Sequence, residues 1–176
     1  MAVNPIPDKL KSFRVYQDGS TDLLGVADVT LPKLEFMKEN ITGSGIAGEV
    51  EMPVAGHVGP MSLSLKWRVV TPNLIRLATP EAQNLALYGA IQFFDAGLGQ
   101  ILTRECRLSV RAMPKNVNLG KLEQGKMMDS ETELEILSLR LYLDKVERLH
   151  VDKFNFIFAV DGLDWLAAER QALGLE

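Results

Sequence analysis

The sequence predicts a mainly β protein, all-β or β-rich α+β, with about eight to ten strands and one or two short α-helices. Three segments alternate between polar and apolar residues, which is typical of strands with one hydrated and one buried face. Glycine and proline recur between the segments and indicate turns. Helical spacing of apolar residues is confined to short stretches.

The beginning of the chain predicts short strands joined by turns. Pro5 and Pro7 indicate an extended N-terminal arm over residues 1–12, and Asp18-Gly19 is a hairpin-turn signal. Residues 40–60 are rich in glycine and predict a long loop or a loosely held hairpin. Strands are expected at Phe13–Tyr16, Leu24–Leu31 and Lys33–Glu39, with Pro32 marking an edge or a bend.

The middle of the chain has the clearest strand signals. Thr71 and Pro72 provide an N-cap and a first-turn proline for a short helix that Pro80 ends, and Thr79-Pro80 can open another turn in the same way. Alternating strands are predicted on both sides of this helix. They are Ser62–Val69, with Ser62, Ser64, Lys66 and Arg68 on the polar face, and Ile101–Met113, with Glu105, Arg107, Ser109 and Arg111 on the polar face.

The end of the chain predicts the longest strand and a final helix. After a polar loop at residues 114–130, the strand Glu131–Leu143 changes phase at Ile136-Leu137, which predicts a β-bulge there. Strands at Val146–Val151 and Phe154–Val160 follow, and the second is apolar on both faces and therefore expected to be central. Asp161 or Asp164 can cap a final helix that Gly174 ends.

Composition is that of an ordinary globular protein of one domain. The chain has 176 residues, 47% hydrophobic and 24% charged, with a net charge of −4. Charges of both signs are spread along it, unlike the basic footprint of a protein that grips nucleic acid. A single cysteine excludes an intramolecular disulfide. The sequence shows no signal peptide or membrane-spanning stretch, so folding in the cytoplasm is expected.

Motifs that suggest chemistry lack the context that the chemistry needs. Residues 43–48 spell GxGxxG, but no apolar strand precedes them, no helix is predicted after them and no ribose-binding acid follows, so a flexible glycine loop is favoured. Cys106 shares a face with Leu108 and Val110, which favours an inert core thiol over a nucleophile served by His57 or His150. These residues also lack the spacing of a zinc site. We expect no catalytic residues, no cofactor and no metal.

Three acids, Glu131, Glu133 and Glu135, are the most suggestive of catalysis. Residues two apart on a strand stand about 6.5–7 Å from each other, near the carboxylate separation of inverting glycosidases. Glycosidase acids, however, face each other across a cleft, and no neighbouring pattern predicts a pocket. A hydrated or interface face of a strand is therefore favoured.

A series of short motifs runs from about residue 13 to the C-terminus in a fixed order. It comprises Asp18-Gly19 with Gly25, Val29–Leu34, the glycines 43, 45 and 48, Ser64–Trp67 before Thr71-Pro72, Val151–Asn155, Val160–Asp164, Arg170 and Leu173–Leu175. The most specific part begins at Val151. Taken together, the ordered series resembles the major tail tube protein family of contractile-tailed bacteriophages and related phage-tail-like particles.

The resemblance implies a single tail-tube-like domain over residues 1–176, a β-sandwich or half-barrel of two packed antiparallel sheets with a small helix. Six copies would close a ring, and stacked rings would form a hollow tube with sheath, baseplate and tape-measure proteins as partners. The subunit would be a structural virion protein without catalytic residues, assembled in the cytoplasm of the bacterial host. At genome ejection, DNA would pass through the lumen without specific binding.

On that interpretation, the polar faces of the alternating strands are candidates for the lining of a water-filled lumen. Their cations and carboxylates balance four against four, so we expect a near neutral or acidic lumen along which DNA slides. The candidate lumen residues are Ser62, Ser64, Lys66, Arg68, Glu105, Arg107, Ser109, Arg111, Glu131, Glu133 and Glu135. Glycines allow adaptable docking, so the candidate contacts between rings are Gly43, Gly45, Gly48, Gly56 and Gly59.

Two alternatives stay open at the level of sequence. A tube subunit of a phage-tail-like bacteriocin or a contractile injection system would have the same fold, and a wide lumen or neighbouring secretion genes would favour it. A monomeric β-sandwich that binds sugar would need exposed aromatic residues on one face. Only Trp67 and Trp165 are available for this, and both lie within apolar patterns.

Overall fold

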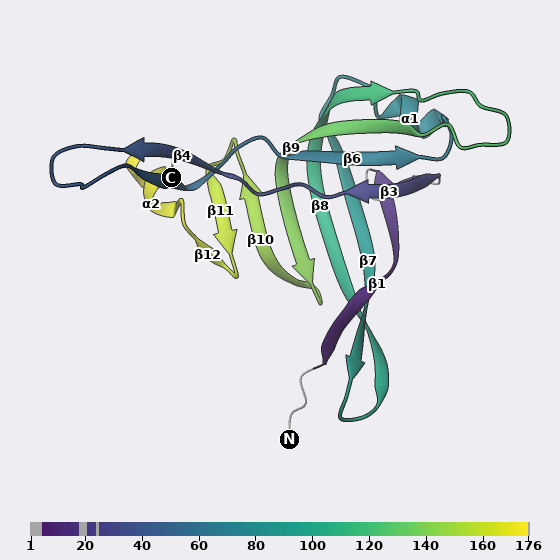
Figure 1. Ribbon diagram of the computed structural model, residues 1–176, viewed down its shortest axis with the longest axis horizontal. Helices are drawn as coiled ribbons and strands as arrows, with labels where there is room; N and C mark the ends of the chain where they lie inside the picture. Colours follow the sequence, from purple (N-terminus) through teal and green to yellow (C-terminus); the bar gives the residue numbers. More distant parts are fainter. Residues whose placement is uncertain (1–4, 18–20, 24, 176) are drawn as a thin grey trace.

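One bent sheet dominates the structure. In the computed structural model, which describes residues 5–17, 21–23 and 25–175, ten strands form this sheet and two more form a separate hairpin, all with antiparallel pairing (Figure 1). The predicted mainly β class with packed antiparallel sheets and two short helices is confirmed. The strands are β1 (Ile6–Gln17), β2 (Thr21–Asp22), β3 (Val26–Thr30), β4 (Phe36–Ile41), β5 (Val50–Val58), β6 (Ser62–Trp67), β7 (Gln83–Asp95), β8 (Gln100–Asn118), β9 (Ser130–Leu143), β10 (Val146–Asp152), β11 (Ile157–Val160) and β12 (Leu163–Asp164), and the helices are α1 (Pro72–Arg76) and α2 (Ala167–Ala172).

Strand β9 changes partner half-way along, and this change bends the sheet. Its first half pairs with β6 as far as Ser62 opposite Glu135, and its second half pairs with β10. Along the other side, β8 steps from Ala112 opposite Ile136 to Arg111 opposite Ser138. Leu137 is therefore the extra residue of a β-bulge, which confirms the predicted one. As a result, β6 and the first half of β9 run across the direction of β7 and β10 (Figure 1).

The apolar core lies inside this bend. Alternation places Leu63, Leu65 and Trp67 of β6 on the inner face, where each is at most 1% exposed. The Trp67 indole donates a hydrogen bond to Thr132 Oγ1 at 3.2 Å, which satisfies two buried polar groups. The side chains that pack with those of β6 include Leu74 of α1, Leu85 and Leu87 of β7, Val110 and Ala112 of β8, and Leu134, Ile136 and Leu139 of β9.

The two helices follow the capping signals only in part. Thr71 Oγ1 accepts a hydrogen bond from the Leu74 backbone N at 3.3 Å, so the predicted cap of α1 is confirmed. The further helical turn expected at Thr79-Pro80 does not form. Neither predicted aspartate is the N-cap of α2, which is Leu166 without a side-chain cap. Gly174 follows α2 with a φ of +70°, as predicted for its C-terminal end.

One expectation near the N-terminus needs correction, and another falls outside the described residues. The predicted arm over residues 1–12 is wrong from Ile6 onward, because β1 pairs with β7 from Ile6 opposite Phe94. Pro7 fits because β1 lies at a sheet edge, where a missing N–H is tolerated. The Asp18-Gly19 turn lies outside the described residues, although β1 and β2 pair on either side of it.

Elsewhere one strand was not predicted, two expected segments have other bounds, and one of two predicted alternatives is confirmed. The sequence pattern did not identify β7 as a strand, because its apolar run does not alternate. β8 continues to Asn118 and passes Pro114 at a register shift, so the predicted loop at 114–130 is shorter. The expected central strand at 154–160 begins only at Ile157 and lies next to the edge strand β12. Residues 40–60 form most of the β4–β5 hairpin, which is the second of the two predicted alternatives.

The bulge supplies the first testable prediction. Deleting Leu137 moves Glu131, Glu133 and Glu135 by one position relative to the second half of β9, and a one-residue slip exchanges the two faces of a strand. We expect the variant to lose cooperative thermal unfolding by circular dichroism. Deleting Gly125, in the loop between β8 and β9, is the control and should leave a cooperative transition. A normal transition for the Leu137 deletion would contradict the role of the bulge.

Candidate assembly surfaces

Ten of the eleven candidate lumen residues lie on the outer face of the bent sheet, Arg68 follows the end of β6, and none of the eleven is buried. The bend divides them into two sections. The upper section lies on β6 and the first half of β9, where Ser62 is opposite Glu135, Ser64 opposite Glu133 and Lys66 opposite Glu131. The lower section lies on β8 and contains Glu105, Arg107, Ser109 and Arg111. Whether this face lines a lumen depends on assembly, and it stays a prediction.

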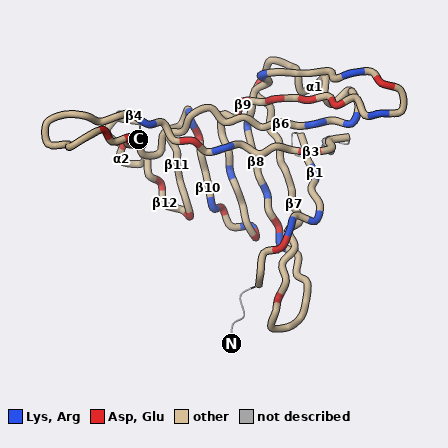
Figure 2. The backbone as a smooth tube through the Cα atoms, viewed as in Figure 1, with Lys and Arg blue, Asp and Glu red and all other residues tan. Residues whose placement is uncertain are grey.

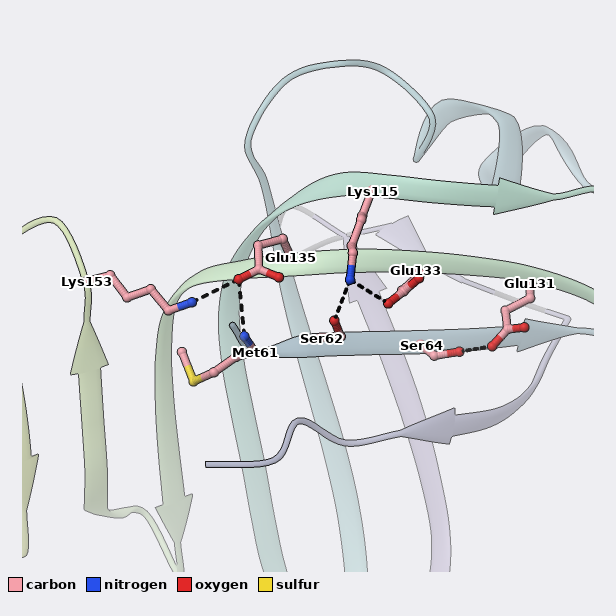
Figure 3. A network of polar contacts seen from close by, with 8 residues as sticks. All are labelled: Met61, Ser62, Ser64, Lys115, Glu131, Glu133, Glu135 and Lys153. Atoms are coloured by element: carbon pink, nitrogen blue, oxygen red, sulfur yellow. Dashed lines mark hydrogen bonds and ion pairs between the residues drawn. The ribbon is translucent and has the colours of Figure 1, made fainter. Parts of the chain in front are cut away.

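Hydrogen bonds and ion pairs hold the acids of the upper section in place (Figure 3). Lys115 Nζ lies 3.0 Å from Glu133 Oε1, and the Ser64 hydroxyl donates to the Glu131 carboxylate. The hydrogen bond from Lys115 is the main reason why the pKa of Glu133 is below its usual range. The three acids therefore lie in a row with cations and hydroxyls beside them, on an open surface rather than facing each other across a cleft. This arrangement does not support a glycosidase pair.

Glu135 also stabilises the branch point of the sheet, the place where β9 changes its partner from β6 to β10. Its Oε1 accepts a hydrogen bond from the Met61 backbone N at 3.2 Å, at the start of β6, and lies 2.9 Å from Lys153 Nζ, just beyond β10 (Figure 3). The Glu135 carboxylate therefore bonds to residues beside both β6 and β10, which are the strands that pair with the first and second halves of β9. Glu135 has a structural task besides its place on the outer face.

The charges of the two sections differ. Three of the four candidate carboxylates belong to the upper section, where Figure 2 shows acidic residues in a row along β9. Arg107 and Arg111 belong to the lower section, and Arg140 of β9 lies on the same face as the cross-strand partner of Ser109. Arg140 was not predicted as part of this face, because the bulge at Leu137 changes which residues of β9 point outward. The candidate set as a whole therefore has four cations and four carboxylates, but the two charges are not balanced within either section.

The candidate inter-ring glycines fall into two places. Gly43, Gly45 and Gly48 lie in the tip of the β4–β5 hairpin, all with positive φ, and β5 rather than a helix follows them. Gly56 and Gly59 lie instead at the base of the hairpin: Gly56 is part of β5, so its assignment to a loop is wrong, and Gly59 lies in the connection from β5 to β6. A Cβ on Gly56 would lie 2.6 Å from Leu166 Cδ2, and Gly59 N donates to Glu35 O at 2.8 Å.

The projecting part of the hairpin has one mostly apolar face, on which Glu39 lies opposite Met52, and one polar face. Ile41 is paired with Val50, and Met52 and Val54 follow on the same face of β5. Each of these four side chains is between 42% and 49% exposed. The opposite face carries the ion pair between Lys38 and Glu51. Among the residues that the structure describes, the contacts that anchor the hairpin lie at its base, where Phe36 packs edge-on against Phe158 and His57 lies 3.1 Å from Glu169 of α2.

Other residues that suggested chemistry are not brought together. Cys106 lies on the inner face of β8, and burial raises the pKa of its thiol. His150 lies on β10 beside Arg140, and His57 lies on β5 beside α2. In the described part of the chain, no three His, Cys, Asp or Glu residues are grouped closely enough to hold a metal ion. None of the helices described is long and apolar enough to cross a bilayer.

The chain matches a known protein family over almost its whole length. The family of phage tail tube protein FII matches residues 7–174. The chain belongs to this family. Its members include the tail tube protein of Escherichia phage P2, which is 30% identical over 97% of this chain and 99% of the relative. The major tail tube protein of Serratia phage KSP20 is 25% identical over 89% of this chain and 90% of the relative. The predicted family is confirmed, and the chain is a structural tail tube subunit.

Chains in solved structures of an extracellular contractile injection system share the fold of this tail tube subunit. A chain of the sheath/tube terminator of an extracellular contractile injection system superposes with a TM-score of 0.54 at 14% identity, covering 80% of this chain and 99% of that one. A chain of the sheath–tube complex of the same kind of system gives 0.51 at 14% identity, covering 81% and 94%. At this identity the likeness concerns the fold alone.

The branch point of the tail tube subunit gives a second prediction. Replacing Glu135 by Ala removes both the bond to Met61 N and the ion pair with Lys153, and hydrogen bonds to charged groups contribute about 1.5–3 kcal/mol. Because the side chain is partly exposed, we expect a loss of about 1–2 kcal/mol in the free energy of unfolding by urea. Glu131→Ala, which loses one bond to Ser64, is the control and should cost about 0.5 kcal/mol or less. Equal losses would contradict the special role of Glu135.

Proposed function

We propose that this tail tube subunit, as one domain over residues 1–176, closes into rings of six copies that stack into the hollow tube of a contractile phage tail. The tube lies within the sheath, is built from the baseplate around a tape-measure protein, and carries DNA through its lumen. The subunit has no enzymatic activity. It folds and assembles in the host cytoplasm and ends in the virion tail. Its membership of the tail tube family supports this proposal.

The exposed apolar face of the β4–β5 hairpin is the observation that carries the proposal. A two-stranded hairpin is at best marginally stable alone in water. This one projects at one end of the molecule beside α2 (Figure 1) and leaves Ile41, Val50, Met52 and Val54 in contact with solvent. Burial against another copy removes this apolar area from water and orders the hairpin. We assign the hairpin to contacts between stacked rings.

The edges of the sheet support lateral contacts between neighbouring copies. In the described residues, β2 pairs only with Tyr16 and Gln17, so no strand covers the outer edge of β1 over Ile6–Phe13. The opposite edge ends with β12, which has only two residues. Pairing one edge with the other in a head-to-tail manner closes a ring when the rotation per subunit divides a full turn. A closed ring leaves no edge open to aggregation.

A tube subunit of a phage-tail-like bacteriocin or contractile injection system is the second candidate. The fold of this chain also occurs in chains of an extracellular contractile injection system. Genes for capsid and genome packaging proteins beside the gene for this chain support the phage tail. Secretion or toxin genes beside it support the second candidate.

Polymerisation tests the proposed function. At high concentration we expect rings or tubes of the purified chain by negative-stain microscopy. Met52→Asp places a charge on the apolar face of the hairpin, and burying it should raise the concentration required for tubes at least about tenfold. Ser44→Asp adds the same charge at the hairpin tip, off that face, and serves as the control.

Two results would count against this assignment. Tubes of normal length from Met52→Asp at the usual concentration would exclude the hairpin as the contact between rings. Uniform small particles of the unaltered chain at every concentration, with or without a baseplate, would favour a monomeric binding module.

A further inference from the structure

Three arginines surround one serine in the lower section of the outer face. Ser109 lies between Arg107 and Arg111 along β8, and Arg140 is its partner on β9. Neighbours of this kind are separated by about 6.5–7 Å along a strand and about 5 Å across strands. The three guanidinium groups therefore border one depression. It has a volume of about 370 Å³, and Asp152 also lines it.

Two polar atoms in this depression lack a partner. Arg107 Nε and Ser109 Oγ are shielded from solvent, and neither has a hydrogen-bond partner among the described residues. The Arg107 guanidinium carbon lies 5.4 Å from the ring centres of both Tyr88 and Tyr142, which flank it on β7 and β9. The two rings hold the cation and exclude water from it, which strengthens its attraction to an anion. Buried donors of this kind are normally hydrogen-bonded, and an anion in the depression would supply the acceptors.

The acid beside the arginines is already engaged. Asp152 accepts hydrogen bonds from Asn155 Nδ2 at 2.9 Å and from the backbone N of Phe154 and Asn155 at 3.1 and 3.0 Å. Although burial opposes ionisation, these bonds outweigh it and hold the pKa of Asp152 below its usual value. The carboxylate therefore serves the turn after β10. The depression keeps a positive charge.

Arg140 is positioned by a neutral histidine. Burial, together with the charge of Arg140, lowers the pKa of His150, so the imidazole is neutral near pH 7. Arg140 Nε donates to His150 Nε2 at 3.2 Å. This bond fixes one side of the guanidinium and leaves its other N–H groups for a ligand.

We propose that Arg107, Arg111, Arg140 and the Ser109 hydroxyl form an oxyanion site that contacts the backbone phosphates of double-stranded DNA. The inference rests on the proposed function, because it requires the outer face to line the lumen. Guanidinium groups match the geometry of phosphate, and phosphate contacts do not read sequence. Repeated around a ring, the site retains DNA weakly and in a salt-dependent way. The lower section of the lumen is then basic, in contrast to the near neutral or acidic lumen expected from the sequence.

Fluorescence anisotropy of a short labelled DNA duplex with the purified, unassembled full chain tests the site. We expect Arg111→Gln and Arg140→Gln each to weaken binding about tenfold, as for a lost charge-assisted contact. Each should also lower the slope of log K against log salt by about one. Arg111→Lys keeps the charge but loses the planar fork, so an intermediate loss is expected. Lys66→Gln removes the same charge from the upper section and should change binding less than about twofold.

Several outcomes overturn the inference. One is an equal loss of DNA affinity in Lys66→Gln and Arg111→Gln, which indicates a diffuse electrostatic attraction between the protein and DNA. Another is saturable binding of inorganic phosphate, titrated separately, without binding of the duplex. A third is unchanged DNA binding by the arginine variants together with loss of their tubes by microscopy, which assigns the arginines to a carboxylate of another copy and leaves the proposed tube function standing. If the unaltered chain binds DNA as expected but never assembles, the proposed function fails and the site stands.

Discussion

The extra residue in β9 is the constraint on which the rest of the structure depends. Because Leu137 has no partner on β8, the strand twists and leaves β6 for β10. The sheet then folds over its own apolar face, and Trp67, Leu63 and Leu134 become buried. Glu135 stabilises the branch by bonding to Met61 at one strand and Lys153 at the other. Without this step, the strands would form a flat sheet with one uncovered apolar face.

The bend also separates surfaces with different tasks. The outer face becomes two sections, one with the carboxylates of β9 held by lysines and serines, the other with arginines around Ser109. The β4–β5 hairpin leaves the body beside α2 and is fixed only at its base, through Gly56 against Leu166 and His57 near Glu169. A subunit built this way has a rigid core for stability. Its exposed edges, hairpin and hydrated face are the surfaces that we propose for contacts with other copies and with DNA.

Local patterns predicted most strands because a period of two is visible in any strand with one wet face. The strand predicted at Ser62–Val69, which is observed over Ser62–Trp67, and the bulge in β9 were found this way. β7 was not recognised, because its apolar run does not alternate, and Phe154 was placed in a strand although it lies exposed in a turn. In the sequence, Pro7 and Pro114 indicate an arm and a loop, but both lie in strands. Pro7 lies at a sheet edge and Pro114 at a register shift, and neither position needs an N–H donor.

The sequence by itself determined the mainly β class, the bulge, the cap of α1 and the tail tube family, because each depends on neighbouring residues or on the order of motifs. Only the tertiary structure decided which residues meet. Arg140 joins Arg107 and Arg111 through cross-strand pairing, and the glycines divide between the tip and the base of the hairpin. These arrangements follow from strand register and from packing between segments far apart in the chain, and neither leaves a local signal in the sequence.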